Sequence, residues 1–389
     1  MSAKFEAPRG MSDILPAAQP RRRRVVTTME DVCRVYGYHR IDTPALEDTG
    51  LIVRTSGEGS DVVQKETYTF EDRGGRSLTM RPEGTAPICR AYVEHGLHRE
   101  PQPQKLYTIA PMWRYDRPQR GRYREHWQLS VEAIGSAGPD VDAEVIRLYA
   151  EVLTRLGLAE WSVNLNSIGD ENCRPAYIER LSAWLDEHDA ELDDEARLKR
   201  ATSPLRVFDV KSERVQSALA GAPKIGDSLC DACREHFAQV RALLDALGIR
   251  YELVPTLVRG LDYYTRTAFE FVDVDDVVIC GGGRYDGLIE AIGGPPTPGI
   301  GFGAGVERLE LALGGDEPQP GIDVFFVLDD GADRAAVQAK LAELRARGVA
   351  ADTDYAGRSV KGQHTQASRL GAKRVVVVGA GTDLSEVGA

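Results

Sequence analysis

Two long segments of alternating polar and apolar residues constrain the fold more than any other feature of this chain. Residues 64–82 alternate on either side of Gly74-Gly75, and residues 104–135 alternate on either side of an arginine-rich loop at residues 118–122. Period-two alternation around a turn is typical of a β-hairpin. We therefore predict two antiparallel hairpins that share one sheet.

Helical patterns surround these strands. Residues 21–36 and 140–157 have helical periodicity, and residues 172–200 are predicted as a charged helix that opens a mainly helical insertion. Further strands are predicted at residues 39–44 and 161–166, and at residues 251–258, 267–274 and 277–280, where Val, Phe or Tyr is frequent.

The last part of the chain has a different pattern. After a linker at residues 314–321 with two prolines and three glycines, residues 322–389 alternate β, α, β, α and β signals, as α/β domains do. We predict four segments: the first part of a main domain (1–166), an inserted helical module (167–250), the second part of the main domain (251–316) and an α/β domain (322–389).

Composition excludes several classes of protein. A formal charge of −12, from 48 Lys and Arg against 60 Asp and Glu, argues against bulk attraction to nucleic acid, so any RNA contact needs a local basic patch. The 6 cysteines are scattered, which indicates a reducing, cytoplasmic compartment rather than a disulfide scaffold. No segment approaches the roughly 18 apolar residues of a membrane span, and the N-terminus lacks a signal-peptide core. We therefore expect neither export nor membrane insertion.

The richest chemical cluster is residues 113–128. It contains five arginines, two tyrosines and two tryptophans: Arg114, Arg117, Arg120, Arg122, Arg124, Tyr115, Tyr123, Trp113 and Trp127. Guanidinium groups bind phosphate oxygens well. A solvated basic loop has the same composition, and spacing alone does not decide between the two.

Three shorter clusters are also candidates. The turn at residues 81–85 contains Glu83 and Thr85, but Glu83 could equally cap the helix that follows. Residues 257–264 place an arginine, an aspartate and two tyrosines together, either in a polar pocket or in a core-facing turn. The glycines of residues 281–287 suit either close backbone approach or a tight turn.

Residues 299–309, GIGFGAGVERL, invite comparison with the dinucleotide fingerprint G-x-G-x-x-G. No clear β-α unit precedes them, so we reject that interpretation. A glycine-rich strand leading into a helix with Arg308 instead leaves flat space for a planar base and provides a cation for a phosphate.

Cys230 and Cys233, with His236 nearby, have part of a metal-ligand spacing. No second pair follows, so structural cysteines at a helix start are the favoured interpretation, and the sequence does not decide whether Cys230 and Cys233 bind a metal. Neither G-x-S-x-G nor H-E-x-x-H occurs, which gives no support to hydrolase and zinc-protease templates.

Taken in order, these clusters resemble the class II aminoacyl-tRNA synthetases, and among them the histidyl-tRNA synthetase family. GYHRIDTPALE (residues 37–47), residues 113–128 and GFGAGVERL (residues 301–309) resemble the three class motifs. LVRGLDYYTRTAFEF and GGGRYDGL resemble the two histidine-specific peptides, and RGMSDILP and RPEGTA also match. The resemblance implies an α+β fold. It comprises a class II antiparallel sheet flanked by helices, an inserted helical module and a C-terminal anticodon-binding-like α/β domain.

The resemblance also implies roles for single residues. Arg114 and Arg259 are expected to be catalytic, with Arg114 and Arg308 binding ATP. The expected histidine-binding residues are Glu83, Gly84, Thr85, Gln128, Glu132, Tyr263 and Tyr264. The acceptor end of the tRNA is expected to contact Arg117, Arg120 and Arg122.

By this resemblance the chain joins L-histidine to AMP with ATP and Mg²⁺, and then passes histidine to its tRNA. A cytoplasmic homodimer is implied, with the first class motif at the dimer interface and residues 1–166 and 251–316 forming the catalytic domain. The chain departs from the pattern at its C-terminus, because the family usually continues beyond RVVVVGAGTDL, so anticodon binding is the weaker expectation.

Two rival functions remain open. One is a catalytically silent relative, the regulatory subunit that partners ATP phosphoribosyltransferase, although Arg114, Arg259 and Arg308 are all present here. The other is a binding module that senses uncharged tRNA. Only a synthetase should exchange pyrophosphate into ATP in the presence of histidine.

Overall fold

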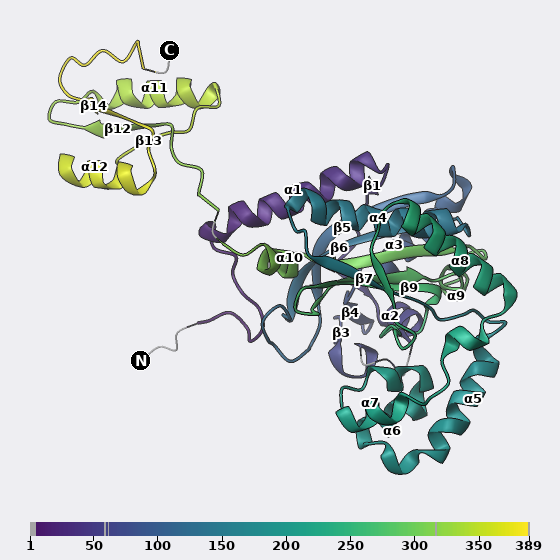
Figure 1. The fold of residues 1–389 in the computed structure, drawn as a ribbon. Helices are drawn as coiled ribbons and strands as arrows, with labels where there is room; N and C mark the ends of the chain where they lie inside the picture. Colours follow the sequence, from purple (N-terminus) through teal and green to yellow (C-terminus); the bar gives the residue numbers. More distant parts are fainter. Residues whose placement is uncertain (1–4, 58–59, 61, 316, 388–389) are drawn as a thin grey trace. The chain divides into compact units, whose positions relative to one another are not determined.

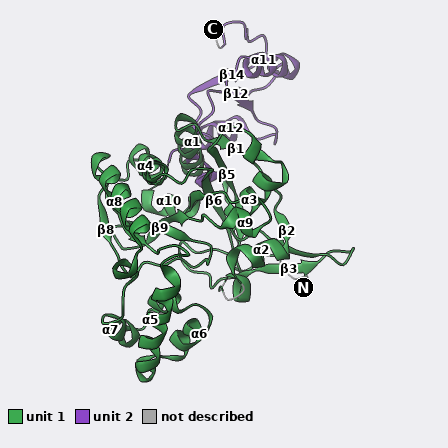
Figure 2. Ribbon diagram, turned by 90° about the vertical axis from the view of Figure 1, so that its right-hand side faces the viewer, with its two compact units in different colours: residues 1–15, 21–315 green, residues 16–20, 316–389 purple. Residues whose placement is uncertain are grey.

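The structure divides into two compact units. It is a computed structural model that describes residues 5–57, 60, 62–315 and 317–387. The larger unit comprises residues 1–15 and 21–315, and the smaller unit residues 16–20 and 316–389 (Figure 2). The predicted insertion at residues 167–250 lies within the larger unit. The predicted domain limits at residues 1, 316 and 389 lie outside the described residues.

The larger unit is built on an eight-stranded sheet with the order β1-β5-β6-β11-β10-β9-β7-β8 in the described residues. Its strands are β1 (His39–Arg40), β5 (Gln104–Trp113), β6 (Glu125–Ile134), β7 (Trp161–Ser167), β8 (Tyr251–Leu253), β9 (Thr265–Asp273), β10 (Val278–Arg284) and β11 (Gly299–Gly305). All neighbours are antiparallel except β1 with β5 and β7 with β8.

Both predicted hairpins form, but they do not share a sheet, so that prediction was wrong. Strands β3 (Tyr68–Glu71) and β4 (Ser77–Met80) join β2 (Leu46–Asp48) in a separate sheet of order β2-β4-β3. The reason is that β5 pairs with β1 and β6 pairs with β11 on their outer edges, so neither strand of the second hairpin has an edge left for β3 or β4.

The strand predicted at residues 39–44 is also shorter than expected. Only β1, at its start, pairs with β5. Beyond β1, the side chain of Arg81 donates to the carbonyl oxygens of Thr43 at 2.7 Å and Pro44 at 3.3 Å. The backbone there is held by a buried guanidinium instead of a neighbouring strand.

Helices cover one face of the large sheet. The main core joins α1 (Gln19–Val35), α4 (Pro139–Leu156) and α8 (Asp231–Ala246) to alternate residues of the central strands, such as Val131 and Phe302. Helix α4 begins with a proline and two aspartates in its first turn and ends at the left-handed Gly157, as helices of its periodicity do. The remaining helical segments of this unit are α2 (Thr49–Ser56), η2 (Val62–Glu66), α3 (Thr85–Glu94), η3 (Leu97–Arg99), α9 (Leu288–Ala291) and α10 (Val306–Leu313).

The insertion has a hydrophobic core of its own. It contains α5 (Arg174–Glu187), η4 (Asp189–Glu191), α6 (Asp194–Thr202), η5 (Pro204–Asp209), α7 (Glu213–Leu219) and η6 (Ile225–Ser228), which gather together in Figure 1. The single charged helix predicted at residues 172–200 is therefore two helices. The Asp193 side chain accepts a hydrogen bond from the Ala196 amide at 2.9 Å and begins the second one.

The smaller unit confirms the β-α-β-α-β pattern. Strands β12 (Val324–Leu328), β13 (Ala351–Thr353) and β14 (Arg374–Val378) form a parallel sheet, with α11 (Arg334–Ala346) and α12 (Val360–Arg369) on opposite faces (Figure 1). A short segment, η1 (Pro16–Ala18), belongs to the same unit. Among the described residues of both units, no helix is long and apolar enough to cross a membrane.

A fully buried ion cluster ties the large sheet to its helices. Arg284 in β10 and Asp142 in α4 are both 0% exposed and pair at 2.7 Å. Asp142 also accepts hydrogen bonds from Thr267 at 2.6 Å and from His236 of α8 at 2.9 Å. Three elements distant in sequence therefore meet at one carboxylate.

Replacing Arg284 by alanine should destabilise the larger unit by about 3–5 kcal/mol, because Asp142 would stay buried without its cation. The measurement is denaturant unfolding followed by tryptophan fluorescence. Since the 4 tryptophans (Trp113, Trp127, Trp161 and Trp184) all lie in the larger unit, the signal reports that unit alone.

The matched control is Arg76→Ala, which removes an ion pair to Asp72 from an arginine whose side chain is 78% exposed. That loss should be much smaller than the loss for Arg284→Ala, because water screens the exposed pair. Equal losses for the two variants would show that the buried cluster does not stabilise the unit as argued.

Candidate active site

A cavity of about 250 Å³ opens on the face of the large sheet opposite α1, α4 and α8. Strand β6 shows the two faces clearly, because Leu129, Val131 and Ala133 lie in the helix-covered core. The alternate residue Gln128 lines the cavity instead. The predicted site residues found in its walls are Glu83, Thr85, Arg114, Arg122, Gln128, Arg259, Tyr263, Tyr264 and Arg308.

Glycine keeps this face of the sheet free of side chains. Gly281 and Gly283 of β10 pair with Gly303 and Gly301 of β11 in direct register. A Cβ on Gly283 would lie 2.9 Å from the ring of Tyr264, and a Cβ on Gly303 would lie 2.7 Å from the amide of Gln128. A Cβ on Gly281 would overlap with the guanidinium of Arg259. The glycine-rich peptides are therefore strands that let functional side chains lie against the backbone, and Gly281 to Gly283 form no tight turn.

Two arginines from different motifs meet at one end of the cavity. Arg114 follows β5 and is anchored through Nε to the Pro82 carbonyl at 2.8 Å, while Arg308 of α10 is anchored through Nε to the Gly121 carbonyl at 3.2 Å. The pKa of Arg308 is lowered, first by burial and then by the positive charges of Arg122 and Arg114. Among the residues that the structure describes, Arg114 has no ion pair. This end of the cavity is thus electrostatically prepared for an anion.

His126, next to these arginines, is neutral because burial and their positive charges disfavour its protonation. His126 lies two residues before Gln128 on the cavity face of β6. Burial and the charges of Arg114 and Arg308 lower the pKa of His126 to about 3. Its imidazole can therefore accept or donate a hydrogen bond near a bound anion without adding to the positive charge.

A third arginine enters from the loop between β8 and β9. Arg259 pairs with Glu270 of β9, whose backbone lies opposite Gly281, and its guanidinium lies 5.8 Å from the ring centroid of Tyr264. The side chain of Arg259 is 17% exposed, so it is held in place but still reaches the cavity.

At the other end of the cavity, Glu83 and Thr85 line the wall and Glu132 lies directly behind Thr85. Glu132 is 0% exposed and accepts a hydrogen bond from Thr85 at 2.6 Å and another from Tyr285. Burial raises the pKa of Glu132 to about 8. The ring centroid of Tyr263 lies 4.5 Å from that of Tyr264 in a tilted arrangement and 5.9 Å from that of Tyr285 in an edge-to-face one, which closes this end with aromatic rings.

The sequence left open whether Glu83 caps a helix or faces a binding site. Its carboxylate accepts hydrogen bonds from the amides of Thr85 at 2.5 Å and Ala86 at 2.9 Å, so it caps α3. It also lines the cavity, and burial raises its pKa. A capping role and a ligand-binding role are therefore compatible.

Some predicted residues lie outside the cavity wall. Gly84 brings the turn against β6, where a Cβ would overlap with Ser130, and Glu132 lies behind Thr85. Arg117 and Arg120 are exposed in the loop between β5 and β6.

Sequence reasoning missed His126 and the role of Tyr285. His126 shares the alternating face with Gln128 and Glu132, so strand periodicity could have identified it, but no local signal marked Tyr285.

Comparisons with known proteins agree with this arrangement. A family model described as histidyl-tRNA synthetase matches residues 10–309. Histidine–tRNA ligases from Desulforudis audaxviator (strain MP104C) and Moorella thermoacetica are each 49% identical to this chain, with 96% of this chain and 90% of each relative covered.

Solved structures are similar as well. Apo S. aureus histidyl-tRNA synthetase matches with a TM-score of 0.80 and 40% identity, covering 97% of this chain and 92% of that one. A protein described as an ATP phosphoribosyltransferase regulatory subunit/histidyl-tRNA synthetase from Bacillus halodurans C matches with a TM-score of 0.70 and 25% identity, covering 98% of this chain and 100% of that one.

The raised pKa of Glu132 predicts a pH-dependent stability. Between its ordinary value of 4.5 and about 8, the folded chain keeps a proton that the unfolded chain releases. Stability from this group is therefore lost as pH rises through that range and changes little above it. Glu132→Gln keeps a neutral hydrogen-bonding side chain and should lack this loss.

The measurement is the free energy of unfolding of the ligand-free protein at several pH values from about 5 to about 8. Over that range the wild type should lose on the order of a few kcal/mol relative to Glu132→Gln. Parallel curves for the two proteins would mean that Glu132 is ionised in the folded state.

Proposed function

Because this chain belongs to the histidyl-tRNA synthetase family, we propose that it is a histidine–tRNA ligase whose active site is the cavity described above. It activates L-histidine with ATP to give histidyl-adenylate and pyrophosphate, and then transfers histidine to the 3′ end of its tRNA. The residue assignments rest on one observation. Arg114, Arg259 and Arg308 line the same cavity, and buried carboxyl groups lie at its other end.

The arginine end suits ATP. We assign Arg114 to the α-phosphate and to the histidine carboxylate, and Arg308 to the γ-phosphate, since both guanidinium groups are anchored through Nε. The glycine strands beside them leave room for the adenine base. Mg²⁺ would bind mainly phosphate oxygens, to which Glu270 or Glu307 could add carboxylate ligands, as this ion prefers.

The carboxyl end suits histidine. Glu83, Thr85 and Gln128 are assigned to the substrate's ammonium group, because they offer acceptor oxygens around one point of the wall. Glu132 and Tyr264 are assigned to the imidazole, with Tyr263 packing beside it. A buried site that must satisfy polar groups rejects isosteres lacking the matching N–H far better than an apolar pocket does.

The chemistry of activation needs charge stabilisation more than proton transfer. When the histidine carboxylate attacks the α-phosphorus, negative charge collects on the oxygens around phosphorus as the bond to pyrophosphate breaks. Fixed cations that are already desolvated stabilise that charge without reorganising. Arg259, held by Glu270 beside Gly281, supplies such a cation.

Contacts to tRNA are assigned to two exposed regions. Arg117, Arg120 and Arg122 lie in the exposed loop between β5 and β6, where they can meet the acceptor end. In the smaller unit, Tyr355 is 65% exposed next to Arg358, which is a suitable platform for an unpaired anticodon base.

The rival regulatory role predicts histidine binding without chemistry. Arg259→Ala separates the two functions, because it should reduce histidine-dependent pyrophosphate exchange by about a thousandfold or more while histidine binding persists. Isothermal titration with histidine alone measures the binding. A variant that exchanges normally would remove Arg259 from the mechanism, and a wild type without exchange would favour the regulatory role.

The matched control is Arg120→Ala, which removes an exposed arginine of the loop. Exchange should be unchanged, because it needs no tRNA, whereas charging of tRNA should weaken and depend less on salt. If both reactions fall together, the loop acts on the adenylation site and its assignment to tRNA is wrong.

The small sheet is assigned to a homodimer interface. Leu46 and Phe70, from β2 and β3, are 38% and 45% exposed, and residues 37–47 carry the first class motif. Sedimentation equilibrium should therefore give twice the 42.6 kDa chain mass. Phe70→Asp should shift the protein toward monomer, whereas Val274→Asp, at another exposed apolar position, should not. A dimer unaffected by Phe70→Asp would place the interface elsewhere.

A further inference from the structure

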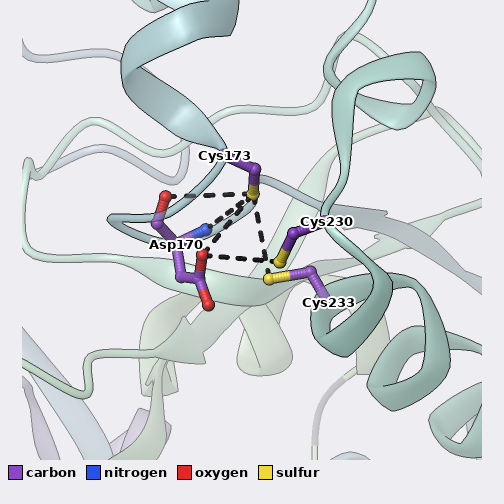
Figure 3. A group of neighbouring side chains, drawn as sticks. All are labelled: Asp170, Cys173, Cys230 and Cys233. Atoms are coloured by element: carbon purple, nitrogen blue, oxygen red, sulfur yellow. Dashed lines mark hydrogen bonds between the residues drawn. The ribbon is translucent and has the colours of Figure 1, made fainter.

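Four potential metal ligands converge outside the active-site cavity. Asp170 and Cys173 lie between β7 and α5, while Cys230 and Cys233 lie at the start of α8. Figure 3 shows their three sulfur atoms and one carboxylate oxygen directed toward one another. All four ligand atoms lie within 4.8 Å of one another.

The separations fit a tetrahedral ion. Zn–S bonds of about 2.3 Å and a Zn–O bond of about 2.0 Å place two sulfurs about 3.8 Å apart and a sulfur and an oxygen about 3.5 Å apart. The sulfurs of Cys173 and Cys233 are 3.9 Å apart. Oδ1 of Asp170 lies 3.5 Å from the sulfur of Cys173 and 3.8 Å from that of Cys230.

The spacing completes the pattern that the sequence showed only in part. Cys230 and Cys233 form one C-x-x-C pair, and the second pair, Asp170-x-x-Cys173, precedes it in the chain instead of following it. His236 lies outside this group of converging ligand atoms, and its Nε2 is hydrogen-bonded to Asp142 at 2.9 Å.

The surrounding residues hold the four ligands in this orientation. Arg266 binds the other oxygen of Asp170 at 3.2 Å, and the amide of Asp170 donates to the Cys173 sulfur at 3.4 Å. Gly169 has a φ of 66°, and a Cβ there would lie 2.7 Å from the same sulfur. Such outer contacts orient ligands in metal sites.

We propose that Asp170, Cys173, Cys230 and Cys233 form a structural Zn²⁺ site. Three soft thiolates exclude Mg²⁺ and Ca²⁺ as the preferred ion, and four protein ligands leave no open position for catalysis. Binding releases the three thiol protons, so affinity falls as pH falls. Asp170, Cys173 and Cys233 are at most 7% exposed, which shields the ion from solvent.

The site would clip the insertion to the rest of the unit. It joins the chain entering the insertion before α5 to the chain leaving it at α8, and so closes the loop formed by residues 174–229. Arg174, next to Cys173, donates to the carbonyl of Tyr264 at 2.6 Å. The clip thus borders the histidine end of the active site without contributing to it.

Metal content of the full-length protein tests the proposal. Protein purified under reducing conditions without chelator should contain about one zinc per chain by mass spectrometry of the metals. After exchange, Co²⁺ should give thiolate charge-transfer absorption and the intense visible bands of a tetrahedral site. Both readouts use the wild type, so they do not depend on whether a variant folds.

Variants identify the ligands. Asp170→Ala should weaken zinc affinity beyond the roughly 10–100-fold typical of losing an outer partner, whereas Asp170→Cys should retain the ion with stronger thiolate–cobalt absorption. Cys33→Ala, which removes a buried thiol of the main core, should retain full occupancy.

Three results would overturn the proposal: a wild type that binds neither zinc nor cobalt, a disulfide among the three cysteines in the reduced preparation, or zinc whose affinity is indifferent to Asp170→Ala.

Discussion

The active site depends on one constraint, which is that two adjacent strands carry no side chains where they face the cavity. Gly281 and Gly283 of β10 lie beside Gly303 and Gly301 of β11, and a Cβ at these positions would meet Arg259, Tyr264, Gln128 and Glu132. Glycine costs some stability in a strand, so the larger core on the opposite face has to offset it. The same backbone can therefore present a flat floor to the cavity and a packed surface to the helices.

Charge divides that floor into two regions. At one end, burial and then the positive charges of Arg122 and Arg114 lower the pKa of Arg308, so an anion would relieve the repulsion among these arginines. At the other end, burial raises the pKa values of Glu83 and Glu132, and both carboxyl groups are hydrogen-bonded by residues of the cavity wall. This division suits the proposed histidine–tRNA ligase. ATP carries negative phosphates and histidine carries a positive ammonium group, and the two substrates react only through the histidine carboxylate and the α-phosphate.

Positions far from the cavity hold these groups in place. Asp142 joins β10, β9 and α8 through Arg284, Thr267 and His236, and this holds the glycine-bearing strand against the helices. On the other side of β9, the cluster of Asp170 and three cysteines lies next to Arg174, which contacts the backbone of Tyr264. The loop that carries Tyr263 and Tyr264 therefore lies between two polar anchor points, neither of which lines the cavity.

The sequence alone predicted those features that depend on residues close together in the chain. Alternation predicted both hairpins, helical periodicity predicted α1, α4 and the β-α-β-α-β unit, and the ordered motifs identified the family and the arginines of the cavity. Only the tertiary structure decided which strands are neighbours, that Glu132 lies behind Thr85, and that Asp170 and Cys173 meet Cys230 and Cys233 across about 60 residues of chain. The physical reason is that period and spacing report on one element at a time, whereas sheet order, burial and ligand geometry arise from competition among elements for the same edges and the same space.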